Sequence, residues 1–226
     1  MFFDGLLKQR CLLCLASHST PLGLCQPCLD DMPWLLDPVC QQCALPCKDR
    51  YCGSCLSNPP YFDASYSVFS YSFPVNAMLQ SYKYGNKLHL ARLFGQLLQH
   101  KVAQNQVDWV LPMPMHPQRL KERGFNQALE IAKIVTQAHP EKLDYQTVKR
   151  PKHNPPQASL AWQARLKNIK GVFKLDAPQI FKDKRVAIVD DVMTTGASLN
   201  ELAKTLKQAG ASHVECWIVA RTLSKF

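Results

Sequence analysis

The chain has 226 residues, of which 46% are hydrophobic and 19% are charged, and its formal net charge at pH 7 is +10. This length is enough for one compact domain of ordinary size and a small additional module. No uninterrupted apolar run of about 18 residues occurs, and the first residues lack the apolar region and cleavage site of a secretory signal. These absences argue against a membrane-spanning or secreted protein, and we expect a soluble cytoplasmic one.

The cysteines are concentrated near the start of the chain. Nine of the ten lie between Cys11 and Cys55, and only Cys216, in an apolar run, lies beyond them. Because cytosolic thiols stay reduced, such clustering favours metal binding over disulfides. We expect Cys216 to be an ordinary core residue.

Eight of these cysteines form Cys-x-x-Cys pairs, a spacing that lets two sulfur atoms reach one tetrahedral ion. Two pairs complete a closed structural site of four thiolates, for which zinc is the favoured metal. The two expected sets are Cys11, Cys14, Cys25 and Cys28, followed by Cys40, Cys43, Cys52 and Cys55. A cross-braced arrangement of the same ligands stays open, as do an iron–sulfur cluster and free core thiols, and Cys47 is left over.

Charge divides the chain into two parts. Residues 1–60 hold four Lys/Arg and five Asp/Glu, a net charge of −1, whereas residues 61–226 have a net charge of +11. Since residues 1–60 also contain the cysteine pairs, many prolines and no sustained periodicity, we assign them to a small zinc-ribbon-like module that is rich in cysteine. The stretch Asn58-Pro59-Pro60 is the expected linker, and any polyanion-binding surface should lie on residues 61–226.

Beyond the linker, short β-rich runs alternate with helical patterns. In chain order the expected elements are a strand at Ala64–Tyr71, a helix at Leu88–Val102, a strand at Val107–Met113, a helix at Gln127–Gln137, a strand at Val186–Val189, a helix at Leu199–Ala209 and a strand at Val214–Ala220. This order predicts an α/β fold in which a parallel sheet carries helices on both faces. The proline-rich segment Arg150–Leu160 interrupts it, either as a linker or as a lid or binding loop.

The segment VAIVDDVMTTGAS, Val186–Ser198, is the most specific motif. A buried apolar strand ends in Asp190 and Asp191, and the chain then turns through Thr-Thr-Gly into a helix that begins near Ser198. Such a turn directs backbone N–H groups and the positive end of the helix at one point, which suits a phosphate monoester. Carboxylates beside an anion site can accept hydrogen bonds from vicinal sugar hydroxyls or hold a hydrated cation. The alternative is a helix N-cap next to two surface aspartates.

This segment resembles the 13-residue phosphoribosyl pyrophosphate motif of type I phosphoribosyltransferases. The resemblance implies a type I phosphoribosyltransferase-like domain over residues 61–226, which binds phosphoribosyl pyrophosphate or a related ribose 5-phosphate together with Mg²⁺. It also implies that Asp190 and Asp191 contact the ribose hydroxyls. The 5-phosphate would be held by Thr194, Thr195, Gly196, Ala197 and Ser198.

Further motifs extend along the whole chain. Besides the cysteine pairs, they are Lys83-Tyr84-Gly85, the sequence PMPMHPQRLKERGFNQA at Pro112–Ala128, and the segment Gln157–Phe173. In these motifs the chain is similar to the ComF/GntX family of competence and DNA-utilisation proteins. The similarity implies a ComF-type factor that handles single-stranded DNA during natural transformation or DNA utilisation, in contact with DNA-uptake or recombination proteins.

Basic residues follow the strand expected at 107–113. The resemblance to transferases implies that this loop holds pyrophosphate, so we assign Arg119 and Arg123 to it, although basic residues at such a place can also be a solvated helix face. We expect His116 to be structural or exposed. The segment Arg150–Leu160 would be the hood that closes over substrate. Because it lacks a placed carboxylate or other base, we expect ligand binding, and an active phosphoribosyltransferase with an unidentified base or amine as acceptor stays the alternative.

Aromatic side chains interleaved with Lys/Arg indicate a nucleic-acid surface, because single strands bind where cations meet phosphates and rings stack on bases. The residues assigned to this surface are Lys83, Tyr84, Arg165 and Lys167. Rings at helical spacing are usually core residues, which is the alternative reading of the same pattern.

Overall fold

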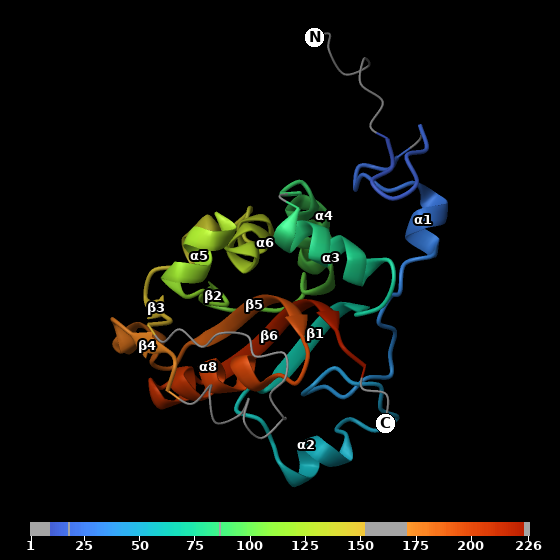
Figure 1. Ribbon diagram of the computed structural model, residues 1–226. Helices are drawn as coiled ribbons and strands as arrows, with labels where there is room; N and C mark the ends of the chain where they lie inside the picture. Colours follow the sequence, from blue (N-terminus) through green and yellow to red (C-terminus); the bar gives the residue numbers. More distant parts are fainter. Residues whose placement is uncertain (1–9, 18, 86, 152–170, 224–226) are drawn as a thin grey trace.

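The computed structural model describes residues 10–17, 19–85, 87–151 and 171–223. Within these ranges the centre of the molecule is a parallel sheet of four strands in the order β1-β6-β5-β2 (Figure 1). The strands are β1 (Ala64–Ser70), β2 (Trp109–Pro112), β5 (Arg185–Met193) and β6 (His213–Arg221). The last strand along the chain, β6, is therefore inserted between β1 and β5.

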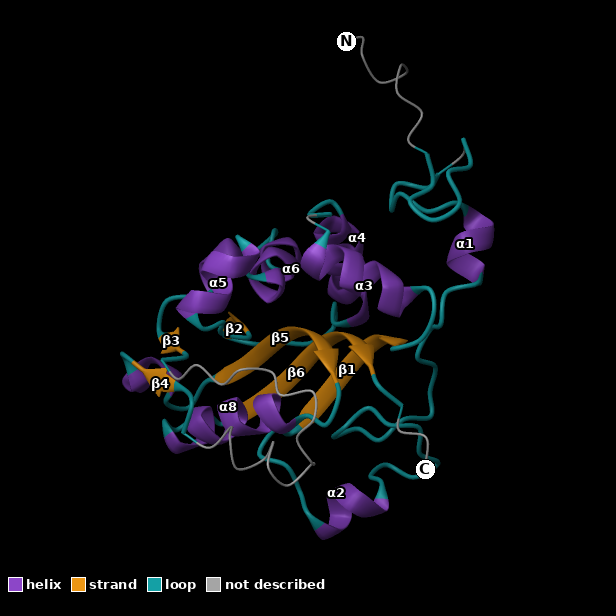
Figure 2. Cartoon of the chain, in the orientation of Figure 1, coloured by secondary structure: helices purple, strands orange, loops and turns teal. Residues whose placement is uncertain are grey.

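Helices cover both faces of the sheet, as Figure 2 shows. One face carries α3 (Val75–Tyr84), α4 (Leu90–Lys101), α5 (Pro117–Arg123) and α6 (Gln127–Val135), and the other carries α8 (Ala197–Gln208). The short elements are α1 (Gln26–Asp30), α2 (Gly53–Ser57), the 3-10 turns η1 (Pro140–Lys142) and η2 (Pro178–Phe181), and the antiparallel pair of β3 (Val148–Lys149) and β4 (Lys174–Leu175). The predicted parallel α/β architecture is confirmed.

The apolar runs of β5 and β6 are buried almost throughout, because helices pack on both faces of a parallel sheet. Cys216 of β6 is a fully buried core residue. The helix layer is tight where α4 crosses α6: a Cβ on Gly95 would come within 2.5 Å of Cβ of Ile134. None of the helices in the described part of the chain has the length and apolar character needed to cross a bilayer.

The elements differ from the sequence predictions mainly in their bounds. Strand β5 runs to Met193, beyond the predicted end at Val189, because its pairing with β6 continues through the polar residues to the partner of Met193, Arg221. Both aspartates of the motif therefore lie within the strand and not after it. The sequence patterns missed α3 and α5 altogether. Both are short, and α5 has no buried residue that would give it an apolar period.

The cysteine-rich segment forms two lobes, which we call the first lobe (residues 10–32) and the second lobe (residues 38–58). Cys11 and Leu24 of the first lobe belong to the same buried cluster as Phe94 of α4. Buried cysteines of the second lobe belong instead to the cluster of β5 and α8. Between the lobes, Trp34 forms an antiparallel bridge with Phe69 of β1, and their rings lie 4.8 Å apart. The first lobe thus packs into one hydrophobic core of the α/β domain, and the second lobe packs into the other.

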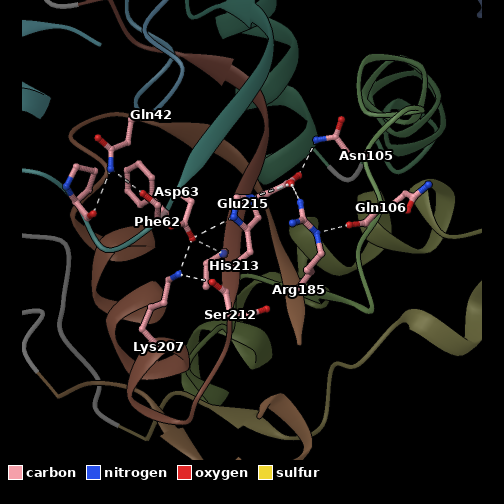
Figure 3. A network of polar contacts seen from close by, with 12 residues as sticks. Gln42, Phe62, Asp63, Asn105, Gln106, Arg185, Lys207, Ser212, His213 and Glu215 are labelled. Atoms are coloured by element: carbon pink, nitrogen blue, oxygen red, sulfur yellow. Dashed lines mark hydrogen bonds and ion pairs between the residues drawn. The ribbon is translucent and has the colours of Figure 1, made fainter. Parts of the chain in front are cut away.

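A polar network closes the amino end of the sheet (Figure 3). Glu215 of β6 is only 2% exposed, and its carboxylate accepts a hydrogen bond from Nδ2 of Asn105 at 2.6 Å and pairs with Arg185 at 3.2 Å. Nearby, Asp63 pairs with Nζ of Lys207 at 2.7 Å. A buried carboxylate is tolerated only when it is paired and hydrogen-bonded in this way. The network ties the loop after α4 to the starts of β5 and β6, at the end of the sheet opposite to the motif.

Candidate functional site

The phosphate loop, residues 193–198, connects β5 to α8 at the carboxyl end of the sheet. Gly196 caps α8 with a φ of 76°, in the region that favours glycine, and a Cβ there would lie 2.7 Å from Cε of Met193. The hydroxyl of Thr195 accepts a hydrogen bond from the backbone N–H of Ala197 at 3.2 Å. The loop thus leads into the amino end of α8, whose first backbone N–H groups have no acceptor within the helix, as an anion site requires.

Asp190 and Asp191 lie just before this loop, and both line a cleft that Ser198 of the loop also lines. Asp191 is buried, its backbone N–H donates to Oδ1 of Asp190 at 2.9 Å, and its carboxylate forms an ion pair with Nζ of Lys83. Burial and, second, the charge of Asp191 raise the pKa of Asp190 to about 8, although the charge of Lys83 acts in the opposite direction. One ammonium for two carboxyl groups leaves the pair able to accept hydrogen bonds or a cation.

Basic side chains face the aspartates across this cleft, whose volume is about 330 Å³. They are Arg119 and Arg123 of α5, and Arg150, which follows β3. Burial lowers the pKa of Arg150, and the charge of Arg119 lowers it further. Among the described residues, no carboxylate forms an ion pair with any of the three. The cleft therefore combines an acidic wall with a basic wall that lacks counter-charges, which suits an anion bearing hydroxyl groups.

The structure gathers most of the residues that the motif and its resemblance indicate. Ser198 lines the cleft together with the aspartates and the two arginines of α5, whereas Thr194 and Thr195 are exposed in the loop itself. His116 caps α5, because its Nδ1 accepts a hydrogen bond from the backbone N–H of Gln118 at 3.2 Å.

The residues predicted for nucleic acid are placed differently from one another. Lys83 lies in the cleft, against Asp191. Tyr84 is 75% exposed, and the guanidinium of Arg123 lies over its ring, 5.1 Å from the centroid. Arg165 and Lys167 lie outside the described residues, as do Lys152 and His153 of the expected hood.

Sequence reasoning missed two residues that shape the site. Oε1 of Gln127 accepts a hydrogen bond from Nη1 of Arg123 at 2.6 Å and so orients that guanidinium. Arg221 donates to the backbone carbonyls of Met193 and Thr194, at the start of the phosphate loop. No local pattern indicates Arg221, because it reaches the loop through the pairing of β6 with β5.

The eight predicted metal ligands gather in two sets, one in each lobe, and not in a cross-braced arrangement. Within each set the four sulfur atoms lie within 4.8 Å of one another. The Sγ–Sγ distance is 3.5 Å for Cys14 and Cys25, and 3.6 Å for Cys43 and Cys52. A tetrahedral zinc ion with Zn–S bonds of about 2.3 Å places its sulfurs about 3.8 Å apart, so both sets fit the ion.

One thiol in each set, that of Cys11 or of Cys40, has a lowered pKa and ionises readily. Burial opposes ionisation of Cys11 and Cys40, but hydrogen bonds from backbone N–H groups outweigh it and lower the pKa values to about 6 and about 7. The N–H of Leu13 lies 3.5 Å from Sγ of Cys11, and that of Cys52 lies 3.3 Å from Sγ of Cys40. Thiolates are the form that binds zinc. Cys47 is half-buried and outside both sets.

Two family models match the chain. The phosphoribosyl transferase domain matches residues 87–225, from just before α4 to beyond β6, and includes the phosphate loop and most residues of the cleft. The double zinc ribbon domain matches residues 2–56, which contain both cysteine sets. The predicted transferase-like sheet and the preceding zinc-ribbon module are confirmed.

Named relatives match almost the whole chain. Competence protein F of Haemophilus influenzae is 31% identical over 227 residues, which cover 94% of this chain and 96% of that protein. DNA utilization protein YhgH of Escherichia coli is 29% identical over 194 residues, with coverage of 82% and 85%. Competence protein ComFC of Streptococcus pneumoniae is 26% identical over 199 residues, with coverage of 86% and 80%. The chain therefore belongs to the ComF family, with a double zinc ribbon joined to a phosphoribosyltransferase domain.

Proposed function

We propose that the chain is a ComF-type factor that binds phosphoribosyl pyrophosphate, or a related ribose 5-phosphate, and handles single-stranded DNA in natural transformation or DNA utilisation. The observation that carries the ligand is a single cleft in which Ser198 of the phosphate loop and the aspartate pair lie together with Arg119, Arg123 and Arg150. The 5-phosphate, the ribose hydroxyls and the pyrophosphate of the ligand each have a group of residues with suitable chemistry.

The 5-phosphate suits the amino end of α8, where unsatisfied N–H groups and the helix dipole favour an anion. Vicinal ribose hydroxyls can donate hydrogen bonds to Asp190 and Asp191, and these charge-assisted bonds are the strong ones. The pyrophosphate suits Arg119 and Arg123, whose planar forks match phosphate oxygens. Mg²⁺ prefers oxygen ligands, and the aspartate pair supplies carboxylate oxygens in the described cleft.

Several observations support the DNA part of the proposal. The relatives are named for competence and for DNA utilisation. Residues 61–226 carry a net charge of +11, as a partner of polyanions should. The exposed ring of Tyr84, stacked on Arg123 beside the cleft, can stack on a base while the cation meets a phosphate. We place this activity in the cytoplasm, in contact with other DNA-uptake or recombination proteins.

Calorimetry of phosphoribosyl pyrophosphate with Mg²⁺ tests the ligand site. Asp190→Asn combined with Asp191→Asn keeps the shape of the pair but removes both charges, so binding should weaken by several kcal/mol, about 1.5–3 for each lost bond. The matched control, Asp176→Asn with Asp183→Asn, removes two exposed carboxylates outside the cleft and should bind normally. Unchanged affinity in a folded double variant of the cleft would refute the site. Pyrophosphate release on addition of nucleobases or amines would show a working transferase instead.

A further inference from the structure

Arg221 is the last residue of β6, and only 4% of it is exposed. In the described part of the chain its guanidinium meets no carboxylate and donates instead to four backbone carbonyls. The acceptors are the oxygens of Cys43 at 2.8 Å, Met193 at 2.9 Å, Thr222 at 2.9 Å, and Thr194. A fully buried arginine with so many contacts is fixed in one position.

Three of these acceptors belong to two different sites. Cys43 is a ligand of the second cysteine set, whereas Met193 and Thr194 end β5 and begin the phosphate loop. Nε of Arg221 donates toward the cysteine set, and Nη1 donates toward the loop. The rigid planar fork of a guanidinium can span both, whereas the single ammonium of a lysine cannot.

Neighbouring contacts join the same two parts. The backbone N–H of Tyr61, just after the second lobe, donates to Oδ1 of Asn200 in the first turn of α8 at 2.6 Å. The ring of Phe62 comes so close that a Cβ on Gly196 would lie 3.8 Å from its Cζ. The first lobe packs on the α4 side, and among the described residues none of its groups donates to or accepts from the phosphate loop.

The second cysteine set lies beside Arg221, because Nε of Arg221 donates to the carbonyl oxygen of Cys43, a member of the set. Four thiolates outweigh the charge of one zinc ion, so the set remains negative with zinc bound. Since an uncompensated buried charge is strongly unfavourable, Arg221 depends on this set.

We propose that Arg221 is a positioning residue that couples the second cysteine set to the phosphate loop, so that the loop keeps its ligand-binding shape only while this set holds zinc. The first set has no such connection. The proposal uses the ribose 5-phosphate site of the proposed function as one readout and adds a dependence on one particular metal centre.

Hydrogen exchange on the full chain tests the coupling without any ligand. Arg221→Lys keeps the charge but loses the fork, so exchange of the amides in residues 193–198 should rise about tenfold or more. Arg185→Lys, at the opposite end of the sheet, is the matched control and should leave loop exchange unchanged. A folded Arg221→Lys protein that retains its zinc and shows normal loop exchange would overturn the proposal.

Removal of each metal site separately is the second test. Cys52→Ser with Cys55→Ser removes the second site, and it should raise loop exchange and weaken binding of ribose 5-phosphate by about tenfold. Cys25→Ser with Cys28→Ser removes the first site and should leave both quantities within about twofold. Equal effects of the two pairs would contradict a specific connection. These variants decide the question even if Arg221→Lys does not fold.

Coupling is reciprocal, so ligand should in turn protect the metal. Ribose 5-phosphate should slow the loss of one zinc ion per chain to a chelator, and the variant without the first site should identify it as the ion of the second set. Arg221→Lys should abolish this protection, which a merely structural role would not do. Protection that survives in Arg221→Lys would count against the proposal. If the parent protein fails to bind ribose 5-phosphate, the proposed function is refuted, and the exchange experiments still decide the role of Arg221.

Discussion

Asp190 combines a place in the ligand cleft with a pKa of about 8, so a large share of its carboxyl groups is protonated in neutral solution. The cause is burial first and the adjacent charge of Asp191 second. Lys83 compensates the pair only in part, since it is one ammonium against two carboxyl groups. Ionisation of Asp190 is therefore unfavourable in the free protein. A bound cation, or a ligand that donates hydrogen bonds to the carboxylate, would make it more favourable.

Stability should therefore depend on pH through Asp190. Its pKa is raised above that of an unfolded aspartic acid, about 3.9, so this stability is complete below about pH 4 and is lost as the pH rises to about 8. Asp190→Asn cannot ionise, and its free energy of unfolding should exceed that of the parent by a few kcal/mol, at most about 5, at pH 8 and match it near pH 4. Chemical denaturation at both pH values measures the difference. Exposed Asp183→Asn should show no such gain, and a gain of equal size at both pH values would contradict the assignment.

At the same scale, the sequence predicts residues that act locally and misses those that act across the fold. Asp190 and Asp191 follow from one continuous motif, because a strand, a turn and a helix start within a few residues place them beside the loop. The sequence predicts Lys83 for nucleic acid and does not indicate its ion pair with Asp191, because that contact depends on how α3 packs on the sheet. Arg221 gave no signal, since a terminal strand residue looks the same whether it faces solvent or carbonyl groups.

Among the elements, β5 is longer than the strand predicted from the sequence. Apolar residues alone placed its end at Val189, yet the ladder with β6 continues and carries both aspartates inside the strand. Hydrogen bonding to a neighbour sets the length of a strand, and that neighbour is unknown from the sequence. Strong periods, in contrast, gave α4, α6 and α8 to within two residues at each end.

The first lobe is an element whose zinc can be tested directly. Cys25→Ser should lower the zinc content from about two ions per chain to about one and should open residues 10–32 to hydrogen exchange, because metal binding supplies the folding energy of such small modules. Elemental analysis and exchange measure the two effects. Cys47→Ser is the matched control, since Cys47 lies outside both sets and should retain both ions. Freshly purified parent protein without zinc would refute the metal assignment.

In the whole molecule, the excess positive charge and the two cysteine sets lie in different parts of the chain. Residues 61–226 carry the excess of positive charge, but the lobes share the hydrophobic cores of that domain. Deleting residues 1–60 would therefore open both cores, and its effect on DNA binding could not be assigned to a surface. Substitution of exposed charges is the cleaner experiment.

Single-stranded DNA should bind with little sequence preference and weaken steeply with salt, by a slope of log affinity against log salt near −0.7 for each phosphate neutralised. Removal of two contacts, Arg165→Ala with Lys167→Ala, should reduce the slope by about 1.4. Lys101→Ala with Lys182→Ala removes two exposed cations at the amino end of the sheet and should leave the slope unchanged. Fluorescence anisotropy at several salt concentrations measures these slopes. Binding that ignores salt would leave only the small-molecule site.

The position of β6 also governs when the molecule can finish folding during its synthesis. Strands β1 and β5 do not pair with each other, because each pairs with β6 between them. The ribosome must therefore release residues up to Arg221 before the sheet can close, and until then the inner edges of β1 and β5 remain open to wrong partners and to chaperones. A premature stop in this last strand would remove the middle of the sheet and the anchor of the phosphate loop together.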